Sequence, residues 1–139
     1  MKKIFTLSIM ALLVVAVGVG CCACRKGKNN KQLVGTEWHL ERMMGQEVDI
    51  DADQFVFVFS NDGRFSGVGA CNRMMGDYSI TDKGAIKFGA LAGTRMMCPK
   101  AHLEAEFSKI IGQATHYEID GDLLLILSNG ELQAVFRAR

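Results

Sequence analysis

Short runs of hydrophobic residues, separated by glycine-containing turns, follow one another from Leu33 onward. Residues 54–60 read Gln-Phe-Val-Phe-Val-Phe-Ser, and this β-branched and aromatic composition predicts a strand. Phenylalanines occupy one face of that strand and valines the other, so we expect both faces to be covered. The turn Asn61-Asp62-Gly63 predicts that residues 64–70 return as the antiparallel partner strand.

A second group of strands is predicted toward the C-terminal end. Asp120-Gly121 and Asn129-Gly130 are tight-turn signals, and they separate three strands predicted at residues 116–119, 123–128 and 131–137. Two weaker strands are predicted at residues 76–81 and 85–88. Trp38 is expected to anchor a first strand in the core.

One helix is predicted, over about residues 99–112. Pro99 suits the first helical position, and large apolar residues follow at helical spacing: Leu103, Phe107, Ile110 and Ile111. Gly112 is expected to end the helix. These elements predict an α+β fold, mainly an antiparallel β-sheet curled toward a barrel, with this one helix packed on it.

Composition limits the chain to one small domain with an N-terminal appendage. The chain has 139 residues, 49% hydrophobic and 22% charged, which excludes a multidomain enzyme. Six of the 16 lysines and arginines lie in residues 2–31, which contain no acidic residue. Residues 32–139 therefore carry ten basic and fifteen acidic side chains, a net charge of −5. An acidic domain offers no basic face, so we expect no nucleic-acid partner.

The first 20 residues are typical of an export signal. Lys2 and Lys3 precede an apolar stretch at residues 4–19, which is shorter than the ~20 residues of a membrane-spanning helix. Cys21 and Cys22 follow directly, as in the lipobox of bacterial lipoproteins, and one of the two is expected to carry the lipid.

The predicted organisation therefore has three parts. A lipoprotein signal peptide at residues 1–20 is followed by a lipidated, basic, flexible tether at residues 21–32 and by a domain at residues 33–139. The expected location is the bacterial cell envelope, with the domain anchored to the membrane by lipid and facing the periplasm. Plain secretion and an uncleaved anchor are the alternatives.

Cys71 and Cys98 are the cysteines of the predicted domain, and an exported protein favours a disulfide between them. Two other uses of these residues stay open. Thioether and thiolate sulfurs suit Cu(I), so the nearby methionines are an alternative metal site: Met74, Met75, Met96 and Met97. A redox thiol is the other use, because Cys98 precedes Pro99 and would lie at the helix N-cap.

No set of residues recognisable as catalytic occurs in the sequence. The three histidines have no recognisable local context, and paired carboxylates are absent. A possible binding surface is instead predicted beside the cysteines, at Asn72, Arg73, Thr94 and Arg95. We expect no cofactor.

Three sequence segments together resemble the META domain family of HslJ-like heat-shock and envelope proteins. The segments are Leu33-Val-Gly-Thr-Glu-Trp-His-Leu40, Gly67-Val-Gly-Ala-Cys-Asn-Arg73 with Gly76-Asp-Tyr78, and Leu91-Ala-Gly-Thr-Arg-Met-Met-Cys-Pro99 with Glu106 in the following helix. Ala70 and Met75 depart from the family pattern, which commonly has glycine and an aromatic residue at those positions.

The resemblance implies a compact β-rich domain with a Cys71–Cys98 bridge and no established enzyme activity. We therefore expect a non-enzymatic envelope lipoprotein that binds an envelope protein or a small ligand, with a role in stress tolerance. The alternatives are a protein that handles Cu(I) or oxidants and an inhibitor of a cell-wall-degrading enzyme.

Overall fold

The computed structural model describes residues 29–139. The predicted signal peptide, the lipidation site at Cys21 or Cys22 and most of the predicted tether lie outside the described residues. In residues 29–139, no helix has the length and apolar character needed to cross a membrane.

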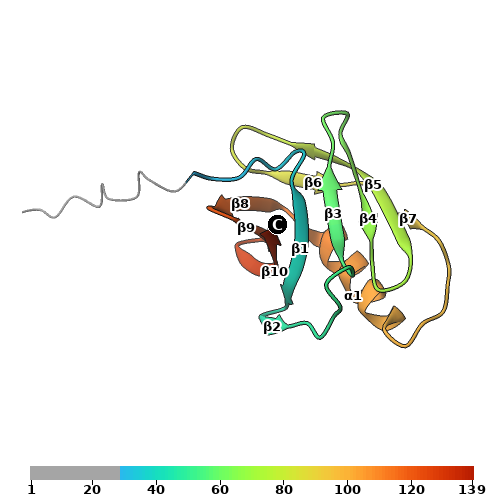
Figure 1. Ribbon diagram of the computed structural model, residues 1–139. Helices are drawn as coiled ribbons and strands as arrows, with labels where there is room; N and C mark the ends of the chain where they lie inside the picture. Colours follow the sequence, from blue (N-terminus) through green and yellow to red (C-terminus); the bar gives the residue numbers. More distant parts are fainter. Residues whose placement is uncertain (1–28) are drawn as a thin grey trace, which may run out of the picture.

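Ten strands and one helix form the domain (Figure 1). In chain order they are β1 (Glu37–Met43), β2 (Gln46–Glu47), β3 (Val56–Phe59), β4 (Arg64–Val68), β5 (Arg73–Ile80), β6 (Ile86–Phe88), β7 (Ala92–Gly93), α1 (Ala101–Gln113), β8 (His116–Asp120), β9 (Leu123–Ser128) and β10 (Glu131–Ala138).

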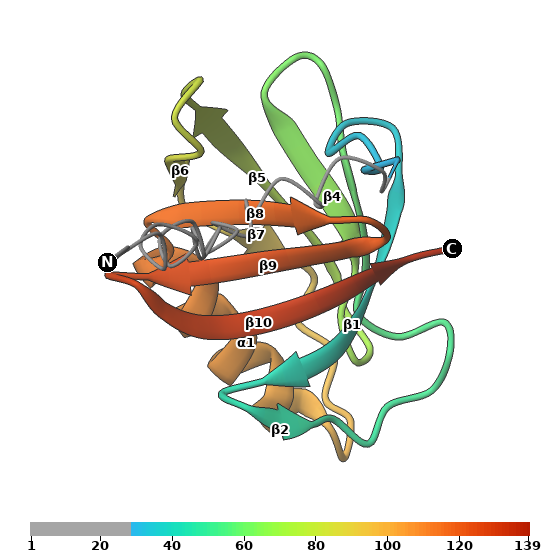
Figure 2. The ribbon, with the colours of Figure 1, turned by 90° about the vertical axis from the view of Figure 1, so that its left-hand side faces the viewer.

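The strands form one antiparallel sheet that nearly closes into a barrel. Along the sheet the order is β6-β5-β4-β3-β1-β10-β9-β8, while β2 pairs with β1 and β7 pairs with β5. The two end strands meet through main-chain hydrogen bonds from Ile86 to Thr115 (3.0 Å) and from Tyr117 to Gly84 (2.9 Å). Figure 2 shows β8, β9 and β10 as neighbouring strands on one wall. The predicted fold class is confirmed.

Glycine residues allow the close approach of β3 and β4 and the tight turn between β9 and β10. A Cβ atom on Gly67 in β4 would lie 2.0 Å from the main-chain oxygen of Val56 in β3, so only glycine fits there. Asn129 and Gly130 both have positive φ angles (50° and 87°), as the tight turn between β9 and β10 requires. This turn was predicted from the sequence.

Aromatic side chains fill the barrel from the β3 side. Phe55, Phe57 and Phe59 are buried, whereas Val56 and Val58 are only half-buried. The expectation that both faces of this strand are covered is therefore only partly met, because the valines lie on the outside of the barrel and the single helix does not cover them. Trp38 is fully buried and its indole N–H donates to the main-chain oxygen of Leu33 (3.0 Å).

Helix α1 packs across the lower end of the barrel in Figures 1 and 2. Phe107 carries this contact: its ring stacks on Phe57 at 4.8 Å between centroids and meets Phe55 edge-on at 5.5 Å. The side chain is fully buried. Ile110 and Ile111 of the helix are also buried in the core, and Phe107 is the helix residue that joins the aromatic cluster of the barrel.

Two elements begin a few residues away from their predicted positions. The helix begins at Ala101 with Lys100 as its N-cap, because residues 99–100 form a turn in which the Ala101 N–H donates to the Cys98 main-chain oxygen (3.1 Å). Cys98 therefore does not occupy the helix N-cap, as the redox hypothesis required. Strand β5 begins at Arg73 rather than at residue 76, since pairing with β4 already starts opposite Val68.

The chain enters the domain at the turn between β8 and β9. The Lys31 N–H donates to the Gly121 main-chain oxygen (2.8 Å), and the Gly121 N–H donates to the Asn30 side-chain oxygen (2.8 Å). Figure 1 shows this point on the left and β7 on the right, at the opposite side of the barrel.

Replacing Phe107 with alanine should lower the free energy of unfolding by about 3–5 kcal/mol, because the cavity would open between the helix and the barrel. Urea denaturation followed by circular dichroism measures this change. Lys109→Ala, on the exposed face of the same helix, should change it by less than about 0.5 kcal/mol. Equal effects of the two substitutions would show that the helix does not depend on Phe107.

Candidate functional site

The two domain cysteines meet where β5 and α1 begin. Cys71 lies in the turn before β5 and Cys98 lies before α1, and the two are joined in a disulfide with their Cα atoms 6.3 Å apart. The bond thus ties the turn between β4 and β5 to the segment that leads into the helix. Both sulfurs are consumed by this bond, which removes the thiols that the redox and copper hypotheses required.

A buried carboxylate on the helix makes a second link to the same turn. Glu104 Oε1 accepts hydrogen bonds from the main-chain N–H groups of Cys71 and Asn72, both at 2.8 Å. Glu104 Oε2 accepts the Asn72 side-chain amide at 2.6 Å. Only 8% of Glu104 is exposed. Because charge-assisted hydrogen bonds in a buried site are strong, this carboxylate fixes the turn against the helix.

Asn72 extends the link to the segment after β7. Its side-chain oxygen accepts hydrogen bonds from the Thr94 hydroxyl (2.8 Å) and the Met96 N–H (2.6 Å). Its amide also donates to the Met96 main-chain oxygen (3.1 Å). We call the disulfide together with Glu104, Asn72, Thr94 and Met96 the Glu104 junction.

Asn72 was predicted to lie on a possible binding surface, but the structure buries most of this residue. Its side chain is 6% exposed and both ends of its amide are occupied within the junction. Thr94 is exposed, but its hydroxyl oxygen also takes part in the junction and accepts the Arg73 N–H (3.1 Å). Arg73 and Arg95 are exposed, so they alone of the four predicted residues offer free side chains.

Glu104 is a site residue that the sequence reasoning missed. The resemblance placed the helix glutamate at Glu106, which is exposed. A signal was present: Glu104 precedes Phe107 by three residues and Ile111 by seven, which places it on the buried face of the helix.

The environment of Glu104 favours its charged form. Burial would raise the pKa of this carboxyl, but hydrogen bonds from the N–H groups of Cys71, Asn72 and Ala70 and from the Asn72 amide outweigh burial. They lower the pKa below its ordinary value of 4.5. Glu104 is therefore an acceptor at neutral pH and is not set up as a general acid.

Exposed arginines and methionines surround the junction. Three methionines close in sequence to the two cysteines are highly exposed, Met75 (54%), Met96 (57%) and Met97 (93%), and Met44 (58%) is exposed in the turn between β1 and β2. Arg73 and Arg95 have no ion-pair partner among residues 29–139. We call these two arginines together with Met75, Met96 and Met97 the arginine–methionine surface. Flexible apolar side chains beside unpaired cations are typical of protein-binding surfaces.

The methionines do not gather in the way that the Cu(I) alternative requires. Met74 and Met75 are adjacent in β5 and face opposite sides, so Met74 is buried (7% exposed) while Met75 is exposed. Across residues 29–139, no group of three or more His, Cys, Asp or Glu side chains is placed to hold a metal ion.

A groove of about 600 Å³ lies between β7 and α1. On one side are residues 91–95 and on the other are small helix residues, Ala101, Ala105 and Ser108. Asn72 and Glu104 also line it, so the junction described above is part of this groove. The groove could not be predicted from the sequence, because its two sides come together only through the junction.

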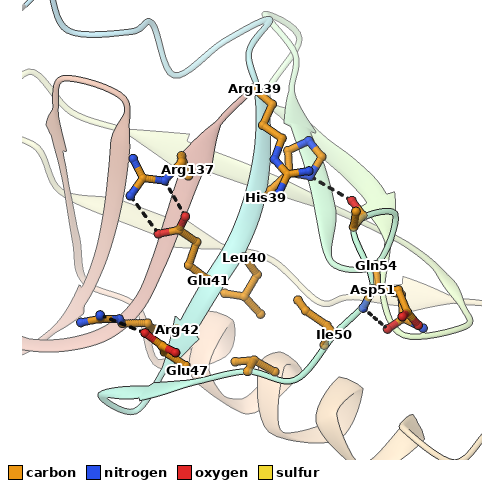
Figure 3. Close-up of a pocket in the computed structure, with 12 residues that line it drawn as sticks. His39, Leu40, Glu41, Arg42, Glu47, Ile50, Asp51, Gln54, Arg137 and Arg139 are labelled. Atoms are coloured by element: carbon orange, nitrogen blue, oxygen red, sulfur yellow. Dashed lines mark hydrogen bonds and ion pairs between the residues drawn. The ribbon is translucent and has the colours of Figure 1, made fainter.

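A second cavity, of about 450 Å³, lies on the outside of β1 (Figure 3). Its charged residues largely pair with one another, Arg137 with Glu41 and Arg42 with Glu47. His39 Nδ1 lies 3.3 Å from the Ala52 main-chain oxygen, and its buried Nε2 has no hydrogen-bond partner in the part of the chain described. The cavity lining includes no serine, cysteine or threonine that His39 could activate.

These features define a small antiparallel barrel whose loops at one end are fixed to a single helix by a disulfide and a buried carboxylate. The META domain family model matches residues 31–139, and the chain belongs to this family. The resemblance seen in the sequence is thereby confirmed. The META domain is not a known enzyme family.

Solved structures share the fold. A protein solved by NMR has a TM-score of 0.62 at 23% identity, covering 76% of this chain and 91% of its own. An NMR structure from Burkholderia xenovorans has a TM-score of 0.59 at 25% identity, covering 77% and 83%. A DUF4847 family protein from Bacteroides vulgatus has a TM-score of 0.50 at 20% identity, covering 63% and 60%. The search of curated proteins gives no match.

Removing the disulfide by the double substitution Cys71→Ser and Cys98→Ser should lower the free energy of unfolding by about 3.6 kcal/mol on the chain-entropy model for the closed loop. The double substitution is used because a single one would leave a thiol free to pair with the cysteines near the N-terminus. Urea denaturation of the oxidised wild type and the variant measures the difference. Equal unfolding free energies would show that the bond is not structural.

Glu104→Gln should lower the free energy of unfolding at pH 7 by about 1–3 kcal/mol, because one of the two acceptor oxygens becomes an NH2 group that faces the hydrogen-bond donors of Cys71 and Asn72. Since the folded-state pKa is lowered, the stabilisation by Glu104 is fully present above pH 4.5 and is lost as the pH falls through the folded-state pKa. The gap between variant and wild type should therefore shrink in acid. Urea denaturation at neutral and acidic pH measures it.

Glu106→Gln is the matched control for this substitution, because Glu106 is exposed on the same helix. It should change the unfolding free energy by less than about 0.5 kcal/mol at either pH. If the two glutamine variants behaved alike, or if the effect of Glu104→Gln did not depend on pH, the assigned role of Glu104 would be wrong.

Proposed function

We propose that this protein is a non-enzymatic envelope lipoprotein whose META domain binds a protein partner through the arginine–methionine surface. The observation that carries the proposal is that this surface combines unpaired arginines with highly exposed methionines on a framework held by the Glu104 junction. A rigid framework reduces the entropy that binding would otherwise lose, so such a surface suits recognition.

The proposed localisation, in the cell envelope with a lipid anchor, follows from the N-terminal sequence. Residues 4–19 are apolar, and Cys21 and Cys22 follow, so one of them is the proposed lipid attachment site. The chain enters the domain at the turn between β8 and β9, which lies on the far side of the barrel from β7 (Figure 1). In a protein anchored this way, the arginine–methionine surface would lie on the side of the barrel opposite the point where the tether enters the domain.

The two other candidate functions have less support. A Cu(I)- or oxidant-handling role would have to work without Cys71 and Cys98 as thiolates, and Met74 is buried while Met97 is exposed. Inhibition of a wall-degrading enzyme rests on similarity of architecture alone.

Metabolic labelling with an alkyne analogue of palmitate in a bacterial host tests the proposed lipid anchor and membrane localisation. The wild-type chain should be labelled and found in the membrane fraction. Either Cys21→Ala or Cys22→Ala should abolish labelling, and the other should leave it unchanged, because only one cysteine becomes the lipidated N-terminus. Labelling that persists when both Cys21 and Cys22 are replaced would overturn the proposed lipid anchor. A wild-type chain found in the soluble fraction would overturn the proposed membrane localisation.

A further inference from the structure

We propose that the groove between β7 and α1 binds an extended peptide segment, which pairs with the free edge of β7 and places an acidic group near Arg95. This inference deepens the proposed binding function by naming the form of the partner. It concerns the domain alone, so it stands or fails independently of the lipid anchor.

The free edge of β7 follows from the pairing of β7 with β5. The Thr94 N–H donates to the Arg73 main-chain oxygen (3.1 Å), and Gly93 lies opposite Met74 in the same register. In an antiparallel pair, hydrogen-bonded and non-hydrogen-bonded residues alternate. The N–H and C=O of Gly93 therefore point away from β5, and β7 has no second strand partner in residues 29–139.

Two further groove residues flank this edge. Leu91 and Arg95 lie two residues on either side of Gly93, outside β7 itself. All three line the groove between β7 and α1. A peptide that adds a strand to a sheet edge forms hydrogen bonds with outward-facing main-chain groups such as those of Gly93.

The groove has room for such a peptide because the facing side of the helix is small. Ala101 and Ala105, one helical turn apart, line the groove, and the longer Glu104 side chain of α1 is held in the junction by its hydrogen bonds. The groove volume of about 600 Å³ lies within the range of about 300–1,000 Å³ that is usual for ligand sites.

The Glu104 junction keeps this groove open. Glu104 on the helix and Asn72 before β5 are hydrogen-bonded at the base of the groove, and Thr94 and Met96 are held by Asn72. The helix and the β7 segment are thus held at a fixed separation before any peptide binds. A preformed groove lowers the ordering cost of binding.

Charge favours a peptide that carries an acidic group. Arg95 lines the groove and Arg73 lies on the adjacent strand, and neither has an ion-pair partner among the described residues. Glu104 is the acidic residue that lines the groove, and its carboxylate is occupied by N–H donors. An aspartate, a glutamate or a terminal carboxylate would pair with the free guanidinium groups.

A phage-displayed library of random heptapeptides, selected on the full-length protein in detergent, tests the proposal. We expect enrichment of peptides with alternating β-branched residues and at least one acidic residue. The best peptide would be synthesised and its dissociation constant measured by fluorescence anisotropy. Failure to enrich any peptide that binds in this assay would overturn the proposal.

Variants then locate the binding site. Ala105→Trp fills the groove and should weaken binding by about tenfold or more, and Arg95→Glu should weaken binding by a similar factor. Lys109→Glu makes the same charge change on the exposed face of α1 and should leave binding unchanged. If Ala105→Trp failed to fold, Arg95→Glu and Lys109→Glu would still decide, because both are surface substitutions. Equal binding by Arg95→Glu and Lys109→Glu would overturn the proposal.

N-methylation of single peptide bonds in the synthetic peptide tests strand pairing itself. Methyl groups at alternate positions should abolish binding, because they remove the N–H groups that face β7, while methyl groups at the intervening positions should have little effect. A helix or a side-chain-only mode of binding would not give this two-residue period. Absence of the period would overturn strand addition even if the peptide bound to the groove.

Discussion

The carboxylate of Glu104 is the contact on which one whole end of the domain depends. It belongs to the helix, yet its hydrogen-bond donors come from residues more than thirty positions earlier in the chain. Removing a charge from water is costly unless donors replace the water, and the turn at residues 70–72 supplies them. The turn gains a rigid acceptor in return, so helix and sheet fix one another at this end.

Two other contacts also hold helix α1 against the sheet. Phe107 lies one helical turn beyond Glu104 and stacks on Phe57 inside the barrel, so the polar and apolar contacts of the helix lie on one face. The disulfide restrains the segment that leads into the helix. A carboxylate requires a particular geometry, whereas burial of an aromatic ring is less directional. Glu104 therefore sets the position of the helix that Phe107 stabilises.

Sequence patterns predicted the fold because the features that determine it are local. The alternation in residues 54–60, the turn at Asn129-Gly130 and the helical spacing around Phe107 each act over a few residues. The junction could not be found in the same way. Asn72 looked like a turn residue on the surface, since nothing near it in sequence reveals partners at Thr94, Met96 and Glu104. The start of the helix was also misplaced, because Pro99 fits a turn as well as a first helical position.

Closing the barrel has a consequence for where the domain can bind. Main-chain hydrogen bonds between the segments of β6 and β8 pair part of the two end strands, whose edges would otherwise be open to other chains. The strands that remain off the barrel path, β2 and β7, are each two residues long. Helix α1 faces the outer edge of β7 across the groove, so a folded sheet from another protein could not reach this edge as a single extended segment could. The same arrangement that limits pairing along the barrel path therefore leaves the short edge of β7 open to a narrow partner.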